Sequence, residues 1–237
     1  MMLLTILSLF MHFSPAAVED YRQVFGRDYQ AAVMYVIEHR EWLVSGLKGY
    51  GQDPAVLVPA VFPELVRYSL LRDRMETGGL MVFYVNLGRD YANFSIGRFQ
   101  MKPAFVERLE SAVTEAGQGA DWLMSIPAYP AEDARAVRSA RVSRLRSDEW
   151  QLRYLACFSH LVGARFGARL AEMGIEDRIR FVSTAYNRGF QAEYGEIVEW
   201  QGRRYFPHGP GSCLPQYNYA DIAVDFYRRS WKEMMED

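Results

Sequence analysis

Cysteine and histidine are scarce in this sequence, which limits the chemistry that the chain can support. The chain of 237 residues includes two cysteines, Cys157 and Cys213, and four histidines that are scattered along it. Their spacing matches no metal-ligand motif, so we expect neither a metal ion nor a cofactor. The two cysteines could form a disulfide in an exported protein. The apolar run YLACFSHLV around Cys157 instead favours a buried free thiol.

An excess of charge of either sign is also lacking. The chain has 27 basic and 29 acidic residues and a net charge of −2, which argues against bulk attraction to nucleic acid or to an acidic membrane. One local series of arginines follows roughly helical spacing: Arg135, Arg138, Arg141, Arg144 and Arg146. Such a series is typical of a solvated helix face, and contact with an anionic polymer is the alternative. We expect the protein to be a monomer.

The apolar stretch at the start of the sequence is too short for a stable membrane anchor. Residues 1–13 carry no charged side chain apart from a possible proton on a histidine. Ser14 and Ala16 are small residues that would precede a cut after Ala16, so residues 1–16 are interpreted as a signal peptide. Residues 17–237 would then form one exported domain, periplasmic or extracellular. An N-terminal helix of the mature fold is the alternative.

The spacing of apolar residues predicts a mainly α-helical fold. Helices are expected over 18–48 with a break near Gly26, and over 56–71, 103–116, 150–173, 177–190 and 217–235. The segments 80–87 and 91–96 are rich in Val, Phe and Tyr and flank the turn sequence GRD, which predicts one small β-hairpin. Residues 189–216 are expected to be loop-like.

Glu64 is the only acidic residue in the apolar run VLVPAVFPELVRYSLL. The run predicts a buried helix that Pro59 and Pro63 must kink or divide. A carboxyl group in apolar surroundings holds its proton to higher pH, as a general acid at neutral pH requires. Alternatively, Arg67 could pair with Glu64 and leave it without a chemical role.

Two further motifs contain polar residues that backbone geometry does not explain. The segment GRFQMKP has the form G-x-x-Q-x-x-P, in which Gly97 and Pro103 suit a tight turn into a helix. Gln100 is a polar amide among hydrophobic neighbours. The segment AYNRG places Tyr186 and Asn187 at the end of a helix that a glycine would stop. Each motif alone is weak.

In this order, the three motifs resemble the lysozyme-like superfamily, in particular the soluble lytic transglycosylases that cut bacterial peptidoglycan. VLVPAVFPE is similar to the helix that carries their catalytic glutamate, GRFQMKP to their Gly-Leu-Met-Gln segment, and AYNRG to their Ala-Tyr-Asn-Ala-Gly segment. The resemblance implies a lysozyme-like helical fold, peptidoglycan strands as the substrate, and Glu64 as catalytic acid and base. It also implies that Gln100, Tyr186, Asn187 and Gly97 lie at the substrate cleft.

The sequence departs from the family pattern at several positions, which keeps the reaction type open. Leu65 follows the glutamate where the family usually has serine, and the interval from Glu64 to Gly97 is longer than usual. A lysozyme would need a second carboxylate, for which Asp90 at the hairpin turn is the first candidate, with Asp73 and Glu76 behind it. Asp90 could equally be a turn-forming residue. A glycan-binding or scaffold domain without catalysis is the third hypothesis.

Overall fold

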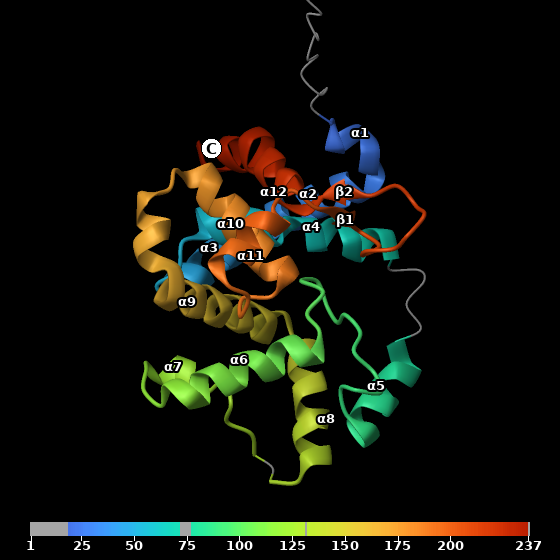
Figure 1. Ribbon diagram of the computed structural model, residues 1–237, viewed down its shortest axis with the longest axis vertical. Helices are drawn as coiled ribbons and strands as arrows, with labels where there is room; N and C mark the ends of the chain where they lie inside the picture. Colours follow the sequence, from blue (N-terminus) through green and yellow to red (C-terminus); the bar gives the residue numbers. More distant parts are fainter. Residues whose placement is uncertain (1–18, 72–76, 131, 237) are drawn as a thin grey trace, which may run out of the picture.

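The computed structural model describes residues 19–71, 77–130 and 132–236, so the predicted signal peptide lies outside the described residues (Figure 1). The helices are α1 (Tyr21–Phe25), α2 (Arg27–Glu38), α3 (Arg40–Gly49), α4 (Pro54–Leu71), α5 (Thr77–Leu87), α6 (Pro103–Ala116), α7 (Asp121–Met124), α8 (Ala134–Leu145), α9 (Asp148–Glu172), α10 (Ile175–Arg188), α11 (Tyr194–Trp200), α12 (Tyr219–Phe226), the π-helical η2 (Tyr227–Trp231) and α13 (Lys232–Glu236). Strands β1 (Arg204–Phe206) and β2 (Tyr217–Asn218) form an antiparallel pair. The predicted mainly helical fold with one small antiparallel sheet is confirmed. Within the described ranges, every helix is too short or too polar to cross a membrane.

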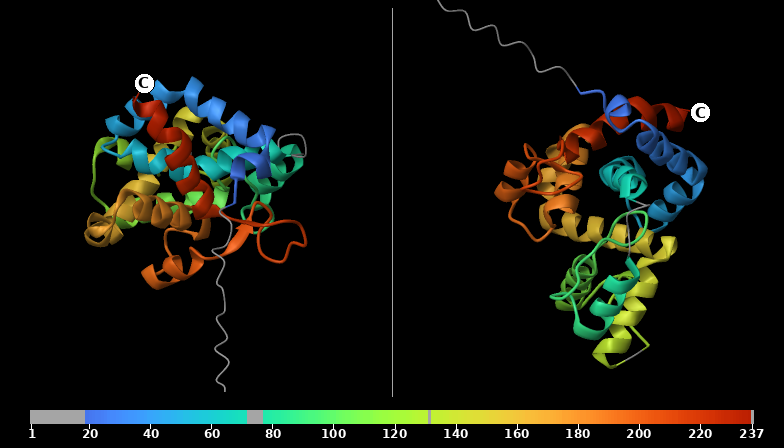
Figure 2. Two further views of the ribbon diagram at one scale, coloured as in Figure 1. Left: turned by 90° about the horizontal axis from the view of Figure 1, so that it is seen from above. Right: turned by 90° about the vertical axis from the view of Figure 1, so that its right-hand side faces the viewer.

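Helix α4 forms the centre of the larger part of the molecule. Its sequence is apolar on all sides, so neighbouring elements must cover it completely. Helices α2, α10 and α12 pack against it, and the right-hand view of Figure 2 shows α4 encircled by its neighbours. The helix is not divided at Pro59 or Pro63. Each proline removes one backbone donor, and packing on every face holds the helix together despite this loss.

Helices α5 to α8 form a second, smaller region, below α9 in Figure 1. Helix α9 connects the two regions because it packs against α3 and α10 on one side and against α6 and α8 on the other. Its central residues Leu155, Cys157 and Phe158 are fully buried. The junction of the two regions is therefore rigidly packed.

The position of the predicted β-hairpin was wrong. Residues 80–87 belong to helix α5 and not to a strand, and residues 91–96 are irregular apart from one bridge between Ile96 and Met101. The run LMVFYVNL lacks alternation, and a short apolar run such as its first six residues does not distinguish a helix from a buried strand. The helix buries Tyr84 and leaves Val82 and Phe83 exposed. The observed strand pair includes β1, which lies with α11 inside the segment that was expected to be loop-like.

The interpretation of the arginine series as a solvated helix face holds for the exposed Arg135 and Arg146 and was wrong for the other three arginines. Arg141 is buried, and its Nη2 lies 2.5 Å from Oε2 of Glu110. Arg138 donates to the Val85 carbonyl at 2.8 Å, which joins α8 to α5, and Arg144 donates to the backbone carbonyl of Ile126 at 2.9 Å. Three of the five arginines therefore hold the smaller region together. Sequence spacing alone did not show which helix would pack against them.

The two cysteines are free. Cys157 is buried and Cys213 is exposed, so the prediction of a buried free thiol at Cys157 is confirmed. Burial raises the pKa of the Cys157 thiol to about 12, with a smaller contribution from the charge of Glu110. This thiol therefore acts as a small core side chain and not as a nucleophile.

Candidate functional site

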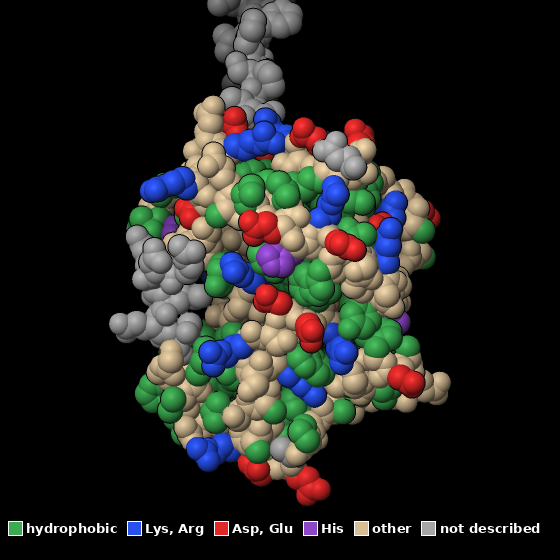
Figure 3. Space-filling view, turned by 180° about the vertical axis from the view of Figure 1, so that it is seen from behind, with side chains coloured by type: hydrophobic (Ala, Val, Ile, Leu, Met, Phe, Trp, Pro, Cys, Tyr) green, Lys and Arg blue, Asp and Glu red, His purple; other side chains and the backbone are tan. Residues whose placement is uncertain are grey.

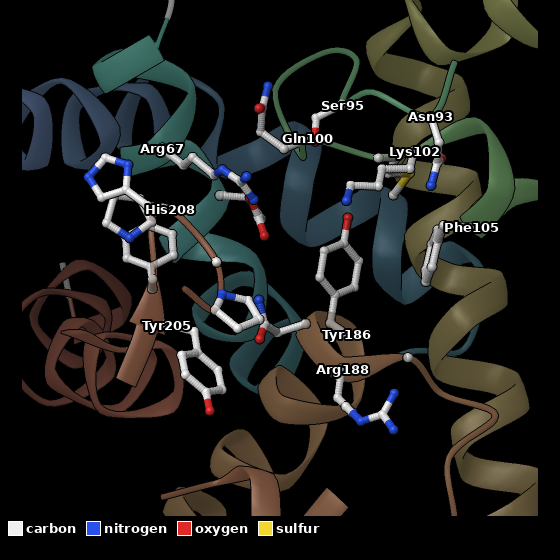
Figure 4. Close-up of a pocket in the computed structure, with 18 of the residues that line it drawn as sticks. Arg67, Asn93, Ser95, Gln100, Lys102, Phe105, Tyr186, Arg188, Tyr205 and His208 are labelled. Atoms are coloured by element: carbon white, nitrogen blue, oxygen red, sulfur yellow. The ribbon is translucent and has the colours of Figure 1, made fainter. Parts of the chain in front are cut away.

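A pocket of about 370 Å³ lies where the two regions of the molecule meet. Its walls come from parts of the chain that are far apart in sequence: α4, the segment 93–102 with the start of α6, the end of α10, and the segment 200–210. Figure 4 shows side chains from these parts around one common space. The three sequence motifs therefore converge on a single pocket.

Glu64 reaches this pocket from the buried helix α4. The residue is 4% exposed, and Nη1 of Arg67 lies 3.7 Å from its Oε2. That separation is too long for a hydrogen bond, and Oε2 has no hydrogen-bond partner among the described residues. Burial raises the pKa of Glu64, while the charges of Arg67 and Lys102 oppose this effect. The carboxyl group thus holds its proton to a higher pH than an exposed glutamic acid.

Gln100 is presented by a tight loop between Ile96 and Met101. Backbone hydrogen bonds run both ways between these two residues, at 2.9 and 3.1 Å. Gln100 has a φ of 49°, a backbone angle that residues other than glycine rarely adopt. Its Nε2 donates to the Gly97 carbonyl at 2.9 Å, whereas its Oε1 is buried and has no hydrogen-bond partner among the described residues. The loop therefore holds an unused acceptor in the wall of the pocket.

Gly97 shapes the same loop from outside the pocket. Its φ is 71°, and a Cβ added there would lie 1.4 Å from Nε2 of Gln151 and 2.8 Å from the carbonyl oxygen of Leu145. Gln151 is fixed in place because it accepts from the Phe99 amide at 2.8 Å and donates to the Leu145 carbonyl at 2.6 Å. Glycine is therefore required here by packing against α8 and α9. Gly97 does not line the pocket itself.

The last turn of α10 places Tyr186 and Asn187 at the pocket. The Tyr186 hydroxyl donates to the Phe99 carbonyl at 2.7 Å, which ties α10 to the Gln100 loop, and Figure 4 shows this hydroxyl pointing toward Lys102. Oδ1 of Asn187 accepts a hydrogen bond from Nε1 of Trp200 at 3.2 Å. Both residues are thus held by hydrogen bonds to neighbouring parts of the wall.

Asp90 is separate from this group. It lies in the exposed turn that follows α5 and does not line the pocket. Asp73 and Glu76 lie outside the described residues. Among the described residues that line the pocket, Glu64 is the one carboxylate.

Four cations line the pocket: Arg67, Lys102, Arg108 and Arg188. The sequence motifs did not identify them as a group. The sequence indicates Arg67 only as a partner for Glu64, one helical turn away. Lys102 lies inside the Gln100 motif, so its presence at the pocket followed from the motif itself. Arg108 carried no such signal, because its place depends on how α6 packs.

The segment 200–210 closes one side of the pocket. Trp200, Tyr205 and Phe206 all line it. Phe206 is also buried against Phe25, with ring centroids 5.9 Å apart. The aromatic residues of this segment therefore both form a wall and attach the segment to the core.

The described residues contain no group of three or more His, Cys, Asp or Glu side chains that could bind a metal ion. Comparisons of the chain with protein-family models, with curated proteins and with solved structures found no match. A functional proposal for this chain therefore depends on its motifs and on the geometry of the pocket.

Proposed function

We propose that the protein is a lytic transglycosylase with a lysozyme-like fold, which cleaves the β-1,4 bond between N-acetylmuramic acid and N-acetylglucosamine in peptidoglycan. One observation carries the proposal. A buried carboxyl group with a raised pKa, that of Glu64, lies in a pocket that Gln100, Tyr186 and Asn187 also line. These are the cleft residues that the resemblance implies. Access to peptidoglycan requires export, for which residues 1–16 would serve as the signal.

The proposed reaction needs a single carboxyl group. Glu64, protonated because burial raises its pKa, donates its proton to the glycosidic oxygen as the bond to C1 of the muramic acid breaks. The oxygen of the substrate's N-acetyl group stabilises the oxocarbenium-like centre. The Glu64 carboxylate then takes the proton of the C6 hydroxyl, whose oxygen bonds to C1. The products are a 1,6-anhydromuramic acid end and a free N-acetylglucosamine hydroxyl, and Glu64 is protonated again.

The neighbours of Glu64 fit this cycle. The guanidinium of Arg67, 3.7 Å from Oε2, stabilises the carboxylate that forms after the first proton transfer. Oε1 of Gln100, which no described residue bonds, can accept a hydrogen bond from a sugar hydroxyl or amide. The rings of Trp200 and Tyr205 line the pocket and offer apolar faces for sugar rings.

Hydrolysis by a lysozyme mechanism has less support. A retaining glycosidase places two carboxyl groups about 5–5.5 Å apart on either side of the bond. Asp90 lies in an exposed turn outside the pocket. A mechanism in which the substrate supplies its own nucleophile does not need it.

The proposal is tested by Glu64→Gln, which preserves the shape of the side chain and removes its proton chemistry. We expect release of soluble muropeptides from purified peptidoglycan to fall on the order of 10²–10⁴-fold. Products of the wild type should carry 1,6-anhydro ends and therefore be one water lighter than hydrolytic products by mass spectrometry. Glu115→Gln, at an exposed position on α6 outside the pocket, is the matched control and should leave activity unchanged.

The other outcomes separate the competing hypotheses. Asp90→Asn should retain most of the activity. Reducing ends, together with Asp90→Asn as damaging as Glu64→Gln, would instead assign a lysozyme. A folded wild type that binds strands and releases no product would assign a scaffold domain, and undiminished cleavage by Glu64→Gln would exclude Glu64 as the acid.

A further inference from the structure

The pocket is strongly cationic, although the chain as a whole is not. Four cations line it, against the single carboxylate of Glu64 among the described residues: Arg67, Lys102, Arg108 and Arg188. The whole chain has a net charge of −2, and the face seen from behind in Figure 3 mixes acidic and basic side chains. Positive charge is therefore concentrated in the pocket.

Three of these four cations have unused binding capacity. Nη2 of Arg188 lies 3.6 Å from Oε1 of Glu196, so this cation has a partner. Lys102 and Arg108 form no ion pair with any described residue. In the described part of the chain, Arg67 has only the 3.7 Å contact with Glu64, and its buried Nε has no hydrogen-bond partner there.

The three under-partnered cations also line the same pocket. Desolvation lowers the pKa of Lys102, and the like charges of Arg67 and Arg108 lower it further, against the opposite effect of Glu64. In Figure 4, Arg67 and Lys102 extend into the pocket from opposite sides. Holding like charges together in partly desolvated surroundings is unfavourable, and a bound anion would relieve the repulsion.

We propose that Arg67, Lys102 and Arg108 form a carboxylate-binding subsite beside Glu64, which selects glycan strands whose muramic acid units carry a negative charge. The inference rests on the proposed function. N-acetylglucosamine is neutral, whereas muramic acid carries a lactyl group whose carboxylate is free in strands without peptides. In strands with peptides, the stem supplies carboxylates instead. Ammonium and guanidinium groups form charge-assisted hydrogen bonds with either source.

The experiment measures binding by the full-length Glu64→Gln variant, which keeps the pocket without turning over substrate. Four soluble glycans are compared: peptide-free strands, peptide-bearing strands, peptide-bearing strands whose carboxylates have been converted to methylamides, and neutral chitin oligosaccharides. We expect the better carboxylate-bearing strand to bind at least about tenfold more tightly than the methylamidated strand, as for loss of a hydrogen bond to a charged group. Added salt should remove most of this difference.

Second substitutions identify the residues responsible. On the Glu64→Gln background, Lys102→Gln and Arg108→Gln should each weaken binding of the carboxylate-bearing strand by roughly tenfold and leave the methylamidated strand unaffected. Arg146→Gln, an exposed arginine outside the pocket, is the matched control and should change neither. Unchanged unfolding midpoints in urea would show that each variant folds.

The outcomes distinguish this subsite from the proposed function. Tighter binding of peptide-free strands would assign the lactyl carboxylate as the ligand, and tighter binding of peptide-bearing strands would assign the stem. Equal binding of native and methylamidated strands would overturn the subsite even if the wild type releases 1,6-anhydro products. Carboxylate-dependent binding that is lost in Lys102→Gln, from a wild type that cleaves nothing, would support the subsite and remove the proposed function.

Discussion

Glu64 and Glu110 are both buried, and their surroundings are opposite. Glu110 accepts hydrogen bonds from Nε and Nη2 of Arg141 at 3.0 and 2.5 Å, and a further one from the hydroxyl of Tyr129. Glu64 has Arg67 at 3.7 Å, and its Oε2 accepts no hydrogen bond from the described residues. Glu110 therefore has its charge matched at hydrogen-bond distance, and Glu64 does not.

The difference indicates what each carboxylate is for. Arg141 also reaches Glu107 at 3.2 Å and the hydroxyl of Tyr84 at 2.6 Å, so the ion pair at Glu110 joins α5, α6 and α8. A carboxylate held in this way cannot exchange a proton with a ligand without losing those bonds. Within the described ranges, no such bond holds Glu64. Its site suits proton transfer, whereas the site of Glu110 suits structural stability.

Removing the cation from each site gives the largest expected contrast. Arg141→Ala should lower the free energy of unfolding by about 3–5 kcal/mol, because it leaves Glu110 buried without its partner. Arg67→Ala should cost less than about 1 kcal/mol, because the pair is long and Arg67 is partly exposed. Urea unfolding of the two variants at neutral pH measures both values. Equal losses would show that Glu64 depends on its cation as strongly as Glu110 does.

The pH dependence of stability sharpens the comparison at Glu64. Burial raises the folded-state pKa of Glu64, whereas in the unfolded chain its pKa is about 4.3. Between these two values the folded state binds more protons, so stability falls as pH rises, by at most about 1.4 kcal/mol per pH unit. This contribution is complete below the unfolded pKa and is lost as pH rises through the folded pKa.

Glu64→Gln has no proton to release at this site. Its free energy of unfolding relative to the wild type should therefore increase with pH from about pH 4.3 upward and level off above the folded pKa. Urea unfolding of both proteins in matched buffers on either side of that window measures this difference. A difference that stays constant across the whole range would mean that the pKa of Glu64 is not raised.

The sequence was sufficient for those parts of the site that local patterns encode. Glu64 stands alone in an apolar helix, and Gln100 and Tyr186 lie in short motifs. The resemblance of these motifs, in their order, to one superfamily implied that the three residues share a cleft. Helix α5 was not predictable, because a short uninterrupted apolar run such as residues 80–85 suits a helix or a buried strand equally. The structure favours the helix because it packs against α8 and buries Tyr84.

Sequence patterns did not predict the contacts between segments that lie far apart along the chain. The pairing of Arg141 with Glu110 joins two helices, and helical spacing gives a series of arginines without showing which of them face inward. The cationic lining of the pocket also depends on contacts between distant segments, because the packing of α6 places Arg108 there. The observed strands are also too short, at three and two residues, to give an alternating pattern.

Two tyrosines beside the glutamates give the smallest expected contrast. Tyr129 donates its hydroxyl hydrogen to Oε1 of Glu110, so Tyr129→Phe should lower the free energy of unfolding by about 1 kcal/mol, the usual net value of one hydrogen bond, while Arg141 continues to hold the carboxylate. The buried hydroxyl of Tyr219, next to Glu64, has no hydrogen-bond partner among the described residues. Its removal in Tyr219→Phe deletes a polar atom that forms no bond, so the change in the free energy of unfolding should be close to zero or slightly stabilising.

Urea unfolding at pH 7 compares the two tyrosine variants, and each serves as the control for the other because both lose the same atom. A loss in Tyr219→Phe as large as that in Tyr129→Phe would mean that the Tyr219 hydroxyl does bond the carboxylate of Glu64, and the contrast between the two glutamates would then be one of degree.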